Sequence, residues 1–292
     1  MKKRLTRFLP FLLAFTIALP SYSVFAEEEN QAKETQTNET NETQADETTA
    51  NDTLSLAAET AVLIDAASGE ILYDKDADKK MYPASITKLM TILLALENGK
   101  LTDEITFSHD AVYNIEPGSA HIAILEGETL TLEQVLRAII LRSANEASNG
   151  VAEYVDGSVE AFAKHMTERA KELGCTNTNF VNANGLFDEN HYTTAHDMAL
   201  IARELLKHEE YRSMMSETDY EIPPTNLQTE TRYLHGQHQM LNPNSIYYYK
   251  DAIGGKTGYT SEAKNTLVTY AEKNDHTLVS VVMENSDGHI YP

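Results

Sequence analysis

A serine and a lysine three residues apart stand at the start of a long apolar segment of this 292-residue chain. If the segment is helical, Ser85 and Lys88 meet on one face of its first turn, because residues three apart are neighbours on a helix. A serine hydroxyl is a weak nucleophile until a base removes its proton. A lysine can be that base only when it is neutral, and burial and the positive end of a helix dipole both lower its pKa. The pair is therefore a candidate serine–lysine nucleophile.

The segment around this pair predicts a buried helix that begins near Ser85. Pro83 precedes the apolar run and Gly99 follows it, which is typical of the two ends of a helix. Apolar side chains fall on almost every face, so the helix should lie in the middle of a domain. Two other interpretations stay open. Ser85 could be a helix cap, and Ser-x-x-Lys is expected about once by chance, as Ser261 and Lys264 illustrate.

A second polar pair lies where one helical pattern ends and another begins. Ser143 and Asn145 form the only Ser-x-Asn in the sequence. A short loop between two buried helices can direct both side chains into a cleft. There a hydroxyl could pass protons and an amide could hold a substrate carbonyl. The alternative is helix capping, for which both residue types are well suited.

The third signal is the glycine-rich segment at residues 254–260. Glycines in a strand allow close approach of another backbone, so a substrate peptide could add to the strand and be held by main-chain hydrogen bonds. Lys256 would bring a positive charge that keeps a neighbouring lysine neutral and attracts a carboxylate. The alternative is a simple glycine-rich turn.

The elements that must position these residues follow from periodicity. The predicted strands are residues 60–65, 70–73, 251–259, 264–271 and 277–283, and the predicted helices are residues 85–98, 130–141, 147–155, 159–173 and 195–206. Strands at both ends with helices between them predict an α+β fold: an antiparallel sheet assembled from the two ends of the domain, with a helical insertion.

The first 26 residues have the form of a secretory signal peptide. Four basic residues precede an apolar run from Phe8 to about Leu19, and cleavage is expected after Ala26. The alternative is an uncleaved membrane anchor, which the shortness of the apolar run disfavours. Residues 27–56 contain nine acidic residues and one lysine, so we expect a disordered acidic linker.

Charge and cysteine content exclude some classes of protein. The net charge is −22, so the chain should bind neither nucleic acid nor an anionic membrane surface. Cys175 is the only cysteine, so an intramolecular disulfide is impossible, and we expect a buried thiol without a catalytic role.

The three motifs, in this order, resemble those of penicillin-binding proteins and serine β-lactamases: Ser85-x-x-Lys88, Ser143-x-Asn145 and Lys256-Thr257-Gly258. The intervening sequence is similar to the low-molecular-mass D-alanyl-D-alanine carboxypeptidases, notably at residues 61–73, 116–119, 180–186 and 191–199. The resemblance covers residues 57–290, so residues 57–292 are expected to form the catalytic domain.

The resemblance implies a role for each catalytic residue. Ser85 attacks the carbonyl between the two terminal D-alanines of a peptidoglycan stem peptide, and Lys88 takes its proton. Ser143 relays a proton to the departing D-alanine. The backbone N–H groups of Ser85 and Tyr259 form the oxyanion hole. β-Lactam antibiotics would acylate the same serine.

The resemblance also assigns the substrate-binding residues. Asn145 positions the substrate, while Lys256 and Thr257 bind near the terminal carboxylate and Gly258 belongs to the same strand motif. No cofactor, metal or nucleic acid is implied. The protein would be exported, extracellular or at the cell-wall face of a bacterial membrane.

The sequence departs from the family pattern in two places. Family members usually continue with a further helix, then often a β-rich domain and an amphipathic membrane anchor, whereas this chain ends at Pro292. A truncated domain is the expectation. Lys264 stands where many relatives carry glycine.

The sequence leaves three alternative functions open. A serine β-lactamase would need a Glu-x-x-Leu-Asn loop between the second and third motifs, and none occurs. A metallopeptidase could use His191 with His196 or His235 with His238, but neither pair lies in a His-Glu-x-x-His helix. The third is a truncated, inactive wall-binding relative.

Overall fold

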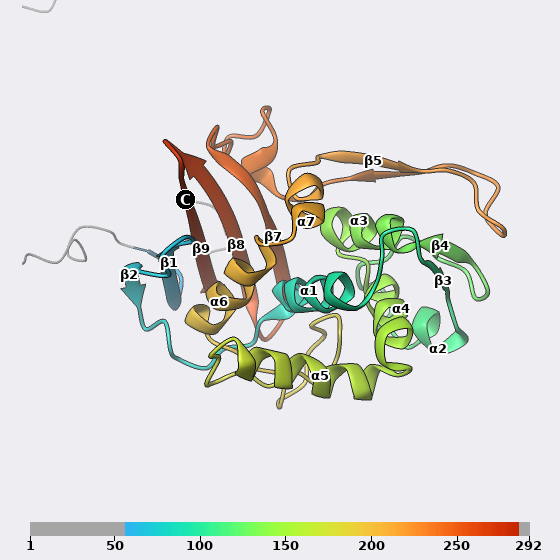
Figure 1. Ribbon diagram of the computed structural model, residues 1–292, viewed down its shortest axis with the longest axis horizontal. Coiled ribbons are helices and arrows are strands. Elements are labelled where there is room, and N and C mark those ends of the chain that lie inside the picture. Colours follow the sequence, from blue (N-terminus) through green and yellow to red (C-terminus); the bar gives the residue numbers. More distant parts are fainter. Residues whose placement is uncertain (1–55, 286–292) are drawn as a thin grey trace, which may run out of the picture. The chain divides into compact units, whose positions relative to one another are not determined.

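The computed structural model describes residues 56–285. They form one five-stranded sheet, two small two-stranded sheets and a set of helices (Figure 1). The predicted α+β fold is therefore confirmed. Apart from Leu56, the predicted signal peptide and acidic linker lie outside the described residues, as does the chain after residue 285.

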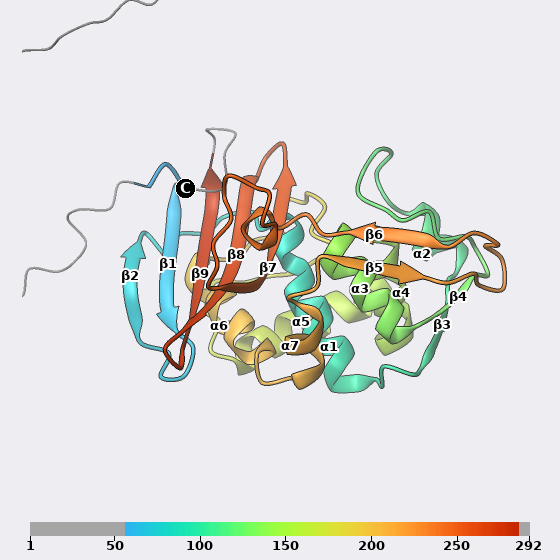
Figure 2. The ribbon, with the colours of Figure 1, turned by 90° about the horizontal axis from the view of Figure 1, so that it is seen from above.

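The large sheet takes its strands from both ends of the described chain. In sheet order they are β2 (Ile71–Lys75), β1 (Thr60–Asp65), β9 (His276–Asn285), β8 (Lys264–Lys273) and β7 (Ala252–Thr260). All neighbouring pairs are antiparallel, and β1 lies between β2 and β9 (Figure 2). The predicted pairing of the two chain ends is confirmed. β7 is an edge strand of this sheet.

Two turns of the sheet depend on left-handed backbone. Asn274 and Asp275 have φ of 52° and 66°, and they join β8 to β9 as a two-residue turn whose twist matches the strands. Lys264 has φ of 55°, a region in which glycine has no steric penalty. The glycine that the resemblance leads us to expect at this position would adopt the conformation without strain.

All the described helices lie between β2 and β7 in the sequence. The longer ones are α1 (Lys88–Asn98), α3 (Leu132–Arg142), α4 (Asn145–Asp156), α5 (Val159–Glu172) and α6 (Ala195–Leu205). Their ends agree with the predicted helices to within three residues. None of the helices within residues 56–285 has the length and hydropathy to cross a membrane.

Helix α1 occupies the centre of the helical part, as predicted. It contacts α3, α4, α5 and α6, and every residue from Lys88 to Ala95 is buried. α6 packs on one face of the sheet against β1 and β9, and the buried Tyr270 hydroxyl of β8 donates a hydrogen bond to the Ala202 carbonyl of α6 at 3.3 Å. The turn that leads into α1 contacts β7 and β8 of the sheet.

Periodicity did not predict the short elements. They are η2 (Ala84–Thr87), β3 (Glu104–Thr106), α2 (His109–Tyr113), β4 (Thr129–Thr131), α7 (Glu209–Met214), β5 (Asp219–Ile222), β6 (Arg232–His235) and η3 (Gln239–Leu241). Segments of three to six residues are too short to show a helix or strand period. Packing against the longer elements decides their form.

Candidate active site

Ser85 and Lys88 lie at the start of α1, but the turn that joins them is not α-helical. Residues Ala84–Thr87 form a 3-10 turn, and the α-helix begins at Lys88. The prediction that the helix begins near Ser85 is therefore corrected by three residues. The Ser85 side chain caps neither segment, so the capping interpretation is wrong.

Two glycines allow this turn to form. Ala84 has φ of 50°, a left-handed conformation that costs energy in a residue with a Cβ. A Cβ at Gly185 would lie 1.9 Å from the Ala84 carbonyl oxygen, and one at Gly258 would lie 2.8 Å from the Ser85 backbone nitrogen. The absence of a side chain at Gly258 thus makes room for the backbone of Ser85. The sequence predicted instead that the glycines of this strand make room for a substrate peptide.

The Lys88 amine has three hydrogen-bond partners. Its Nζ lies 3.0 Å from Ser85 Oγ and 2.8 Å from Asn145 Oδ1, and it also donates to the Asn184 carbonyl. The amide oxygen and the carbonyl can only accept. A neutral amine has two N–H bonds for these acceptors, which leaves its lone pair directed at the Ser85 hydroxyl. This is the geometry of a general base.

The surroundings of Lys88 favour the neutral amine. Burial lowers its pKa well below the usual value of 10.5, the nearby Lys256 lowers it further, and Glu146 acts in the opposite direction. Lys88 is fully buried, so solvent cannot stabilise the ammonium form. The sequence-based expectation of a depressed lysine pKa agrees with this environment.

Ser143 and Asn145 lie at a tight junction between α3 and α4. Ser143 ends α3 with φ of 58° and Asn145 is the first residue of α4, so the predicted loop is only two residues long. Both side chains are buried. Asn145 faces Lys88, whereas Ser143 Oγ accepts a hydrogen bond from Lys256 Nζ at 3.0 Å. The second motif thus contacts both lysines.

Lys256 on β7 is buried without a carboxylate partner among residues 56–285. Its Nζ donates to Ser143 Oγ and to the Thr257 carbonyl, at 3.0 and 2.7 Å. Burial lowers the pKa of Lys256 to about 7. Lys256 is therefore a second lysine of the site with a lowered pKa, and this pKa lies near neutral pH.

Lys256→Met should make stability less dependent on pH. In the unfolded chain lysine keeps its proton up to about pH 10, whereas the folded Lys256 loses it near pH 7. Between these values the unfolded state binds more protons, so this group's contribution to stability rises with pH. The variant should be the more stable protein by about 2 kcal/mol at pH 6, with a smaller advantage at pH 9.

Urea unfolding of both proteins at pH 6 and pH 9 measures this difference. The variant lacks the hydrogen bonds of Lys256 at both pH values. The change between pH 6 and pH 9 in the difference in free energy of unfolding therefore reports the cost of the buried charge. An equal gap at the two pH values would show that Lys256 keeps an ordinary pKa.

Thr257, Gly258 and Tyr259 follow along the edge strand β7. Gly258 brings this strand against the backbone of Ser85, so the neighbouring Tyr259 backbone lies near the nucleophile. The Tyr259 side chain is 63% exposed, and the backbone N–H of this residue stays the predicted donor of the oxyanion hole. The free edge of β7 can pair with a peptide.

Three residues near Ser85 and Lys88 were not assigned to this site from the sequence. The Asn184 carbonyl contacts Lys88. Glu146 is buried, accepts a hydrogen bond from the Ile122 N–H at 2.7 Å, and has a pKa raised by burial. His191 is buried and bonds through Nε2 to Thr87 Oγ1 at 2.9 Å. No local sequence pattern could have assigned these contacts, because each of them joins residues from separate segments of the chain.

The second Ser-x-x-Lys is not a site. Ser261 and Lys264 lie in the exposed turn between β7 and β8. Lys264 Nζ donates to the Ser261 backbone carbonyl at 2.7 Å. The lysine amine bonds a backbone carbonyl and not the serine hydroxyl, so the chance match is a matched control for experiments.

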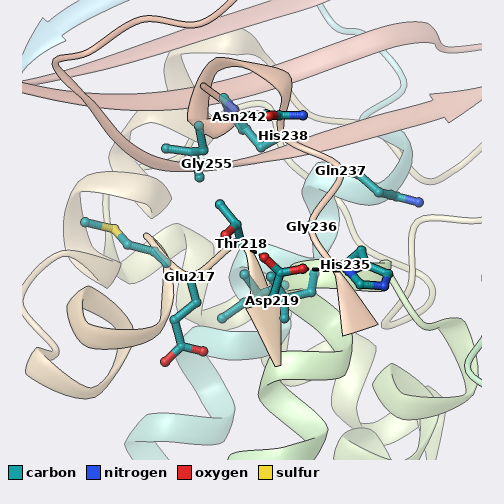
Figure 3. A pocket seen from close by; sticks show the side chains of 13 residues that line it. Glu217, Thr218, Asp219, His235, Gly236, Gln237, His238, Asn242 and Gly255 are labelled. Atoms are coloured by element: carbon teal, nitrogen blue, oxygen red, sulfur yellow. Dashed lines mark hydrogen bonds and ion pairs between the residues drawn. The ribbon is translucent and has the colours of Figure 1, made fainter. Parts of the chain in front are cut away.

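The four histidines of the two pairs each bond a different partner. His235 bonds Asp219 at 2.6 Å at the rim of a cavity of about 260 Å³, and His238 lies beside Gly255 (Figure 3). His196 bonds Asp78, away from the buried His191. In the described part of the chain no three metal-ligating side chains come together.

Cys175 is buried and its pKa is raised by burial. Its Sγ lies 3.4 Å from the Asp197 carbonyl. A thiol that is buried and protonated is a poor nucleophile, as expected for a structural cysteine.

The fold is similar to solved structures of a penicillin-binding protein homologue and a DD-transpeptidase. A model of the D-alanyl-D-alanine carboxypeptidase family, peptidase S11, matches residues 44–287. The chain therefore belongs to the D-alanyl-D-alanine carboxypeptidase family.

Individual relatives agree with this family. The chain is 38% identical over 235 residues to D-alanyl-D-alanine carboxypeptidase DacF of Bacillus subtilis, covering 78% of this chain and 58% of the relative. It is 34% identical to DacC of Escherichia coli, covering 78% and 57%. The chain thus spans a little under three-fifths of these curated relatives. The Streptomyces K15 DD-transpeptidase structure is similar with a TM-score of 0.74 at 26% identity, covering 80% of this chain and 92% of that one.

Proposed function

We propose that this chain is a serine D-Ala-D-Ala carboxypeptidase that removes the terminal D-alanine from peptidoglycan stem pentapeptides. One observation carries the proposal: the buried Lys88 amine lies 3.0 Å from Ser85 Oγ, and its two other partners are oxygens that can only accept hydrogen bonds. This arrangement activates a serine at neutral pH. The family to which the chain belongs supports the choice of substrate.

Acylation is the first half of the proposed reaction. Ser85 Oγ forms a bond to the carbonyl carbon between the two terminal D-alanines, and its proton passes to Lys88. The oxyanion accepts hydrogen bonds from the backbone N–H groups of Ser85 and Tyr259. The C–N bond then breaks, and the leaving nitrogen receives a proton through Ser143. The shortened peptide remains as an ester on Ser85.

Substrate binding uses the edge strand β7 and the start of α4. The peptide main chain pairs with β7 near Gly258, and the Asn145 amide holds it from the opposite side. Its terminal carboxylate binds near Lys256 and Thr257. Because the pKa of Lys256 is lowered to about 7, a bound carboxylate would raise it again and favour the ammonium form.

Hydrolysis of the ester by water completes the cycle and restores Ser85. A β-lactam presents the same carbonyl and is expected to acylate Ser85 as well. Among residues 56–285, no carboxylate is hydrogen-bonded to Ser85 or Lys88. This supports slow loss of the drug and disfavours a β-lactamase, which needs a base for rapid deacylation.

Intact-mass spectrometry after incubation with benzylpenicillin, followed by peptide mapping, tests this proposal together with an assay of D-alanine release from a stem pentapeptide. One drug molecule on Ser85 and measurable release are expected. Rapid loss of the adduct with hydrolysed drug would indicate a β-lactamase instead. An adduct without peptide turnover would favour an inactive wall-binding relative.

We further propose that the protein is exported and acts on the outer side of a bacterial membrane. The basic and apolar pattern of residues 1–26 supports this. Expression of the full chain in a bacterial host should yield a product that begins at Glu27, as N-terminal sequencing would show. A product that retains Met1 would argue against cleavage.

A further inference from the structure

The Lys88 amine depends on a carbonyl from a segment without regular structure. Asn184, whose carbonyl accepts the Lys88 hydrogen bond, lies between α5 and α6, outside every helix and strand. In a helix or sheet the backbone ladder fixes the direction of a carbonyl. Here other contacts must do so.

Asparagine side chains provide these contacts. Asn184 Oδ1 accepts from the Leu186 N–H at 2.9 Å, and Asn184 Nδ2 donates to Asn149 Oδ1 at 3.1 Å. Asn182 Oδ1 accepts from the Gly185 N–H at 2.7 Å. Such side-chain bonds to nearby backbone hold turns that no ladder supports. The Asn184 peptide is thus held from both sides.

Asn149 connects this turn to the helix that carries the other acceptor. It lies four residues after Asn145 on α4, so the two side chains lie on one face of the helix. Asn149 is buried, and its Nδ2 donates to the carbonyls of Ala111 and Asn114 at 3.3 and 3.4 Å. α4 therefore supplies one acceptor of the Lys88 amine, the Asn145 side chain. It holds the other acceptor, the Asn184 carbonyl, through the bond between Asn149 and the Asn184 side chain.

We propose that Asn149 and Asn184 are positioning residues, whose paired side chains fix the Asn184 carbonyl and so direct the Lys88 lone pair at Ser85. The inference rests on the proposed role of Lys88 as base. With one acceptor displaced, the amine can rotate about its Cε–Nζ bond, and its lone pair leaves the Ser85 hydroxyl. The Lys88 amine and the Ser85 hydroxyl are then no longer aligned for proton transfer, although every catalytic residue remains present.

The test measures single-turnover acylation of the full chain by a chromogenic β-lactam from pH 5 to 9, for the wild type, Asn149→Ala and Asn184→Ala. The rate constant is taken from the time course of the molecules that react. Unfolded molecules therefore lower the amplitude of the absorbance change but not its rate constant. We expect plateau rates at least about tenfold lower in both variants.

The pH profile should also change shape. In both variants the Asn184 carbonyl is displaced from the Lys88 amine, whose ammonium form it stabilises in the wild type. The acid limb should therefore move to lower pH, by about 0.5. The other titratable groups facing Lys88 are Lys256, Glu146 and His191, and both variants retain them.

A matched control and a double variant separate positioning from general loss of structure. Thr167→Val removes the hydroxyl that accepts the Phe180 N–H of the same segment, and should lower stability without changing the acylation profile. The double variant should be no slower than Asn184→Ala, because the pair acts as a unit. Unchanged rates in both single variants, or the same change in Thr167→Val, would overturn the inference. A wild type that is not acylated on Ser85 would overturn the proposed function instead.

Discussion

The Ser85→Ala protein should form no adduct with benzylpenicillin, and its release of D-alanine should fall at least about 10⁴-fold. The substitution removes the only hydroxyl bonded to Lys88 in the described structure and leaves a side chain that fits the same turn. The fold should therefore survive, since Ser85 caps neither segment. Intact-mass spectrometry and a D-alanine assay measure the two effects.

Ser261→Ala is the matched control. It alters the other Ser-x-x-Lys, which lies in an exposed turn, and should keep both activities within about twofold. Retained penicillin labelling in the Ser85 variant would mean that another residue is the nucleophile, and peptide mapping of that adduct would identify it.

Lys88→Ala should lower the acylation rate at pH 7 by about 10³-fold. Without the amine, nothing hydrogen-bonded to Ser85 Oγ in the described structure can take its proton. Stopped-flow measurement with a chromogenic β-lactam gives the rate, and the fraction that reacts corrects for any loss of folded protein.

Lys88→Arg and Lys264→Ala complete this experiment. Arginine can still donate to the Asn145 and Asn184 oxygens, but it stays protonated, so this variant should be as inactive as Lys88→Ala. Lys264→Ala should react like the wild type. A loss of less than about tenfold in Lys88→Ala would assign the role of base to another group.

The sequence by itself determined the long elements and the three motifs. The even distribution of apolar side chains after Ser85 predicts a helix buried on all sides, and α1 is buried from Lys88 to Ala95. Short apolar runs rich in β-branched residues at 60–65 and 277–283 predict two strands, and β1 and β9 pair in the sheet. Such patterns are readable because long elements repeat their period several times.

Only the tertiary structure decided how the motifs meet. Ser143 bonds Lys256 while Asn145 bonds Lys88, and a local pattern cannot assign these partners because they come from separate elements. The 3-10 turn at Ser85 likewise depends on Gly185 and Gly258, which lie far away in the chain. The depressed pKa of each lysine arises from burial. Burial is a property of the assembled domain, since it is set by the side chains that distant segments pack around the amine.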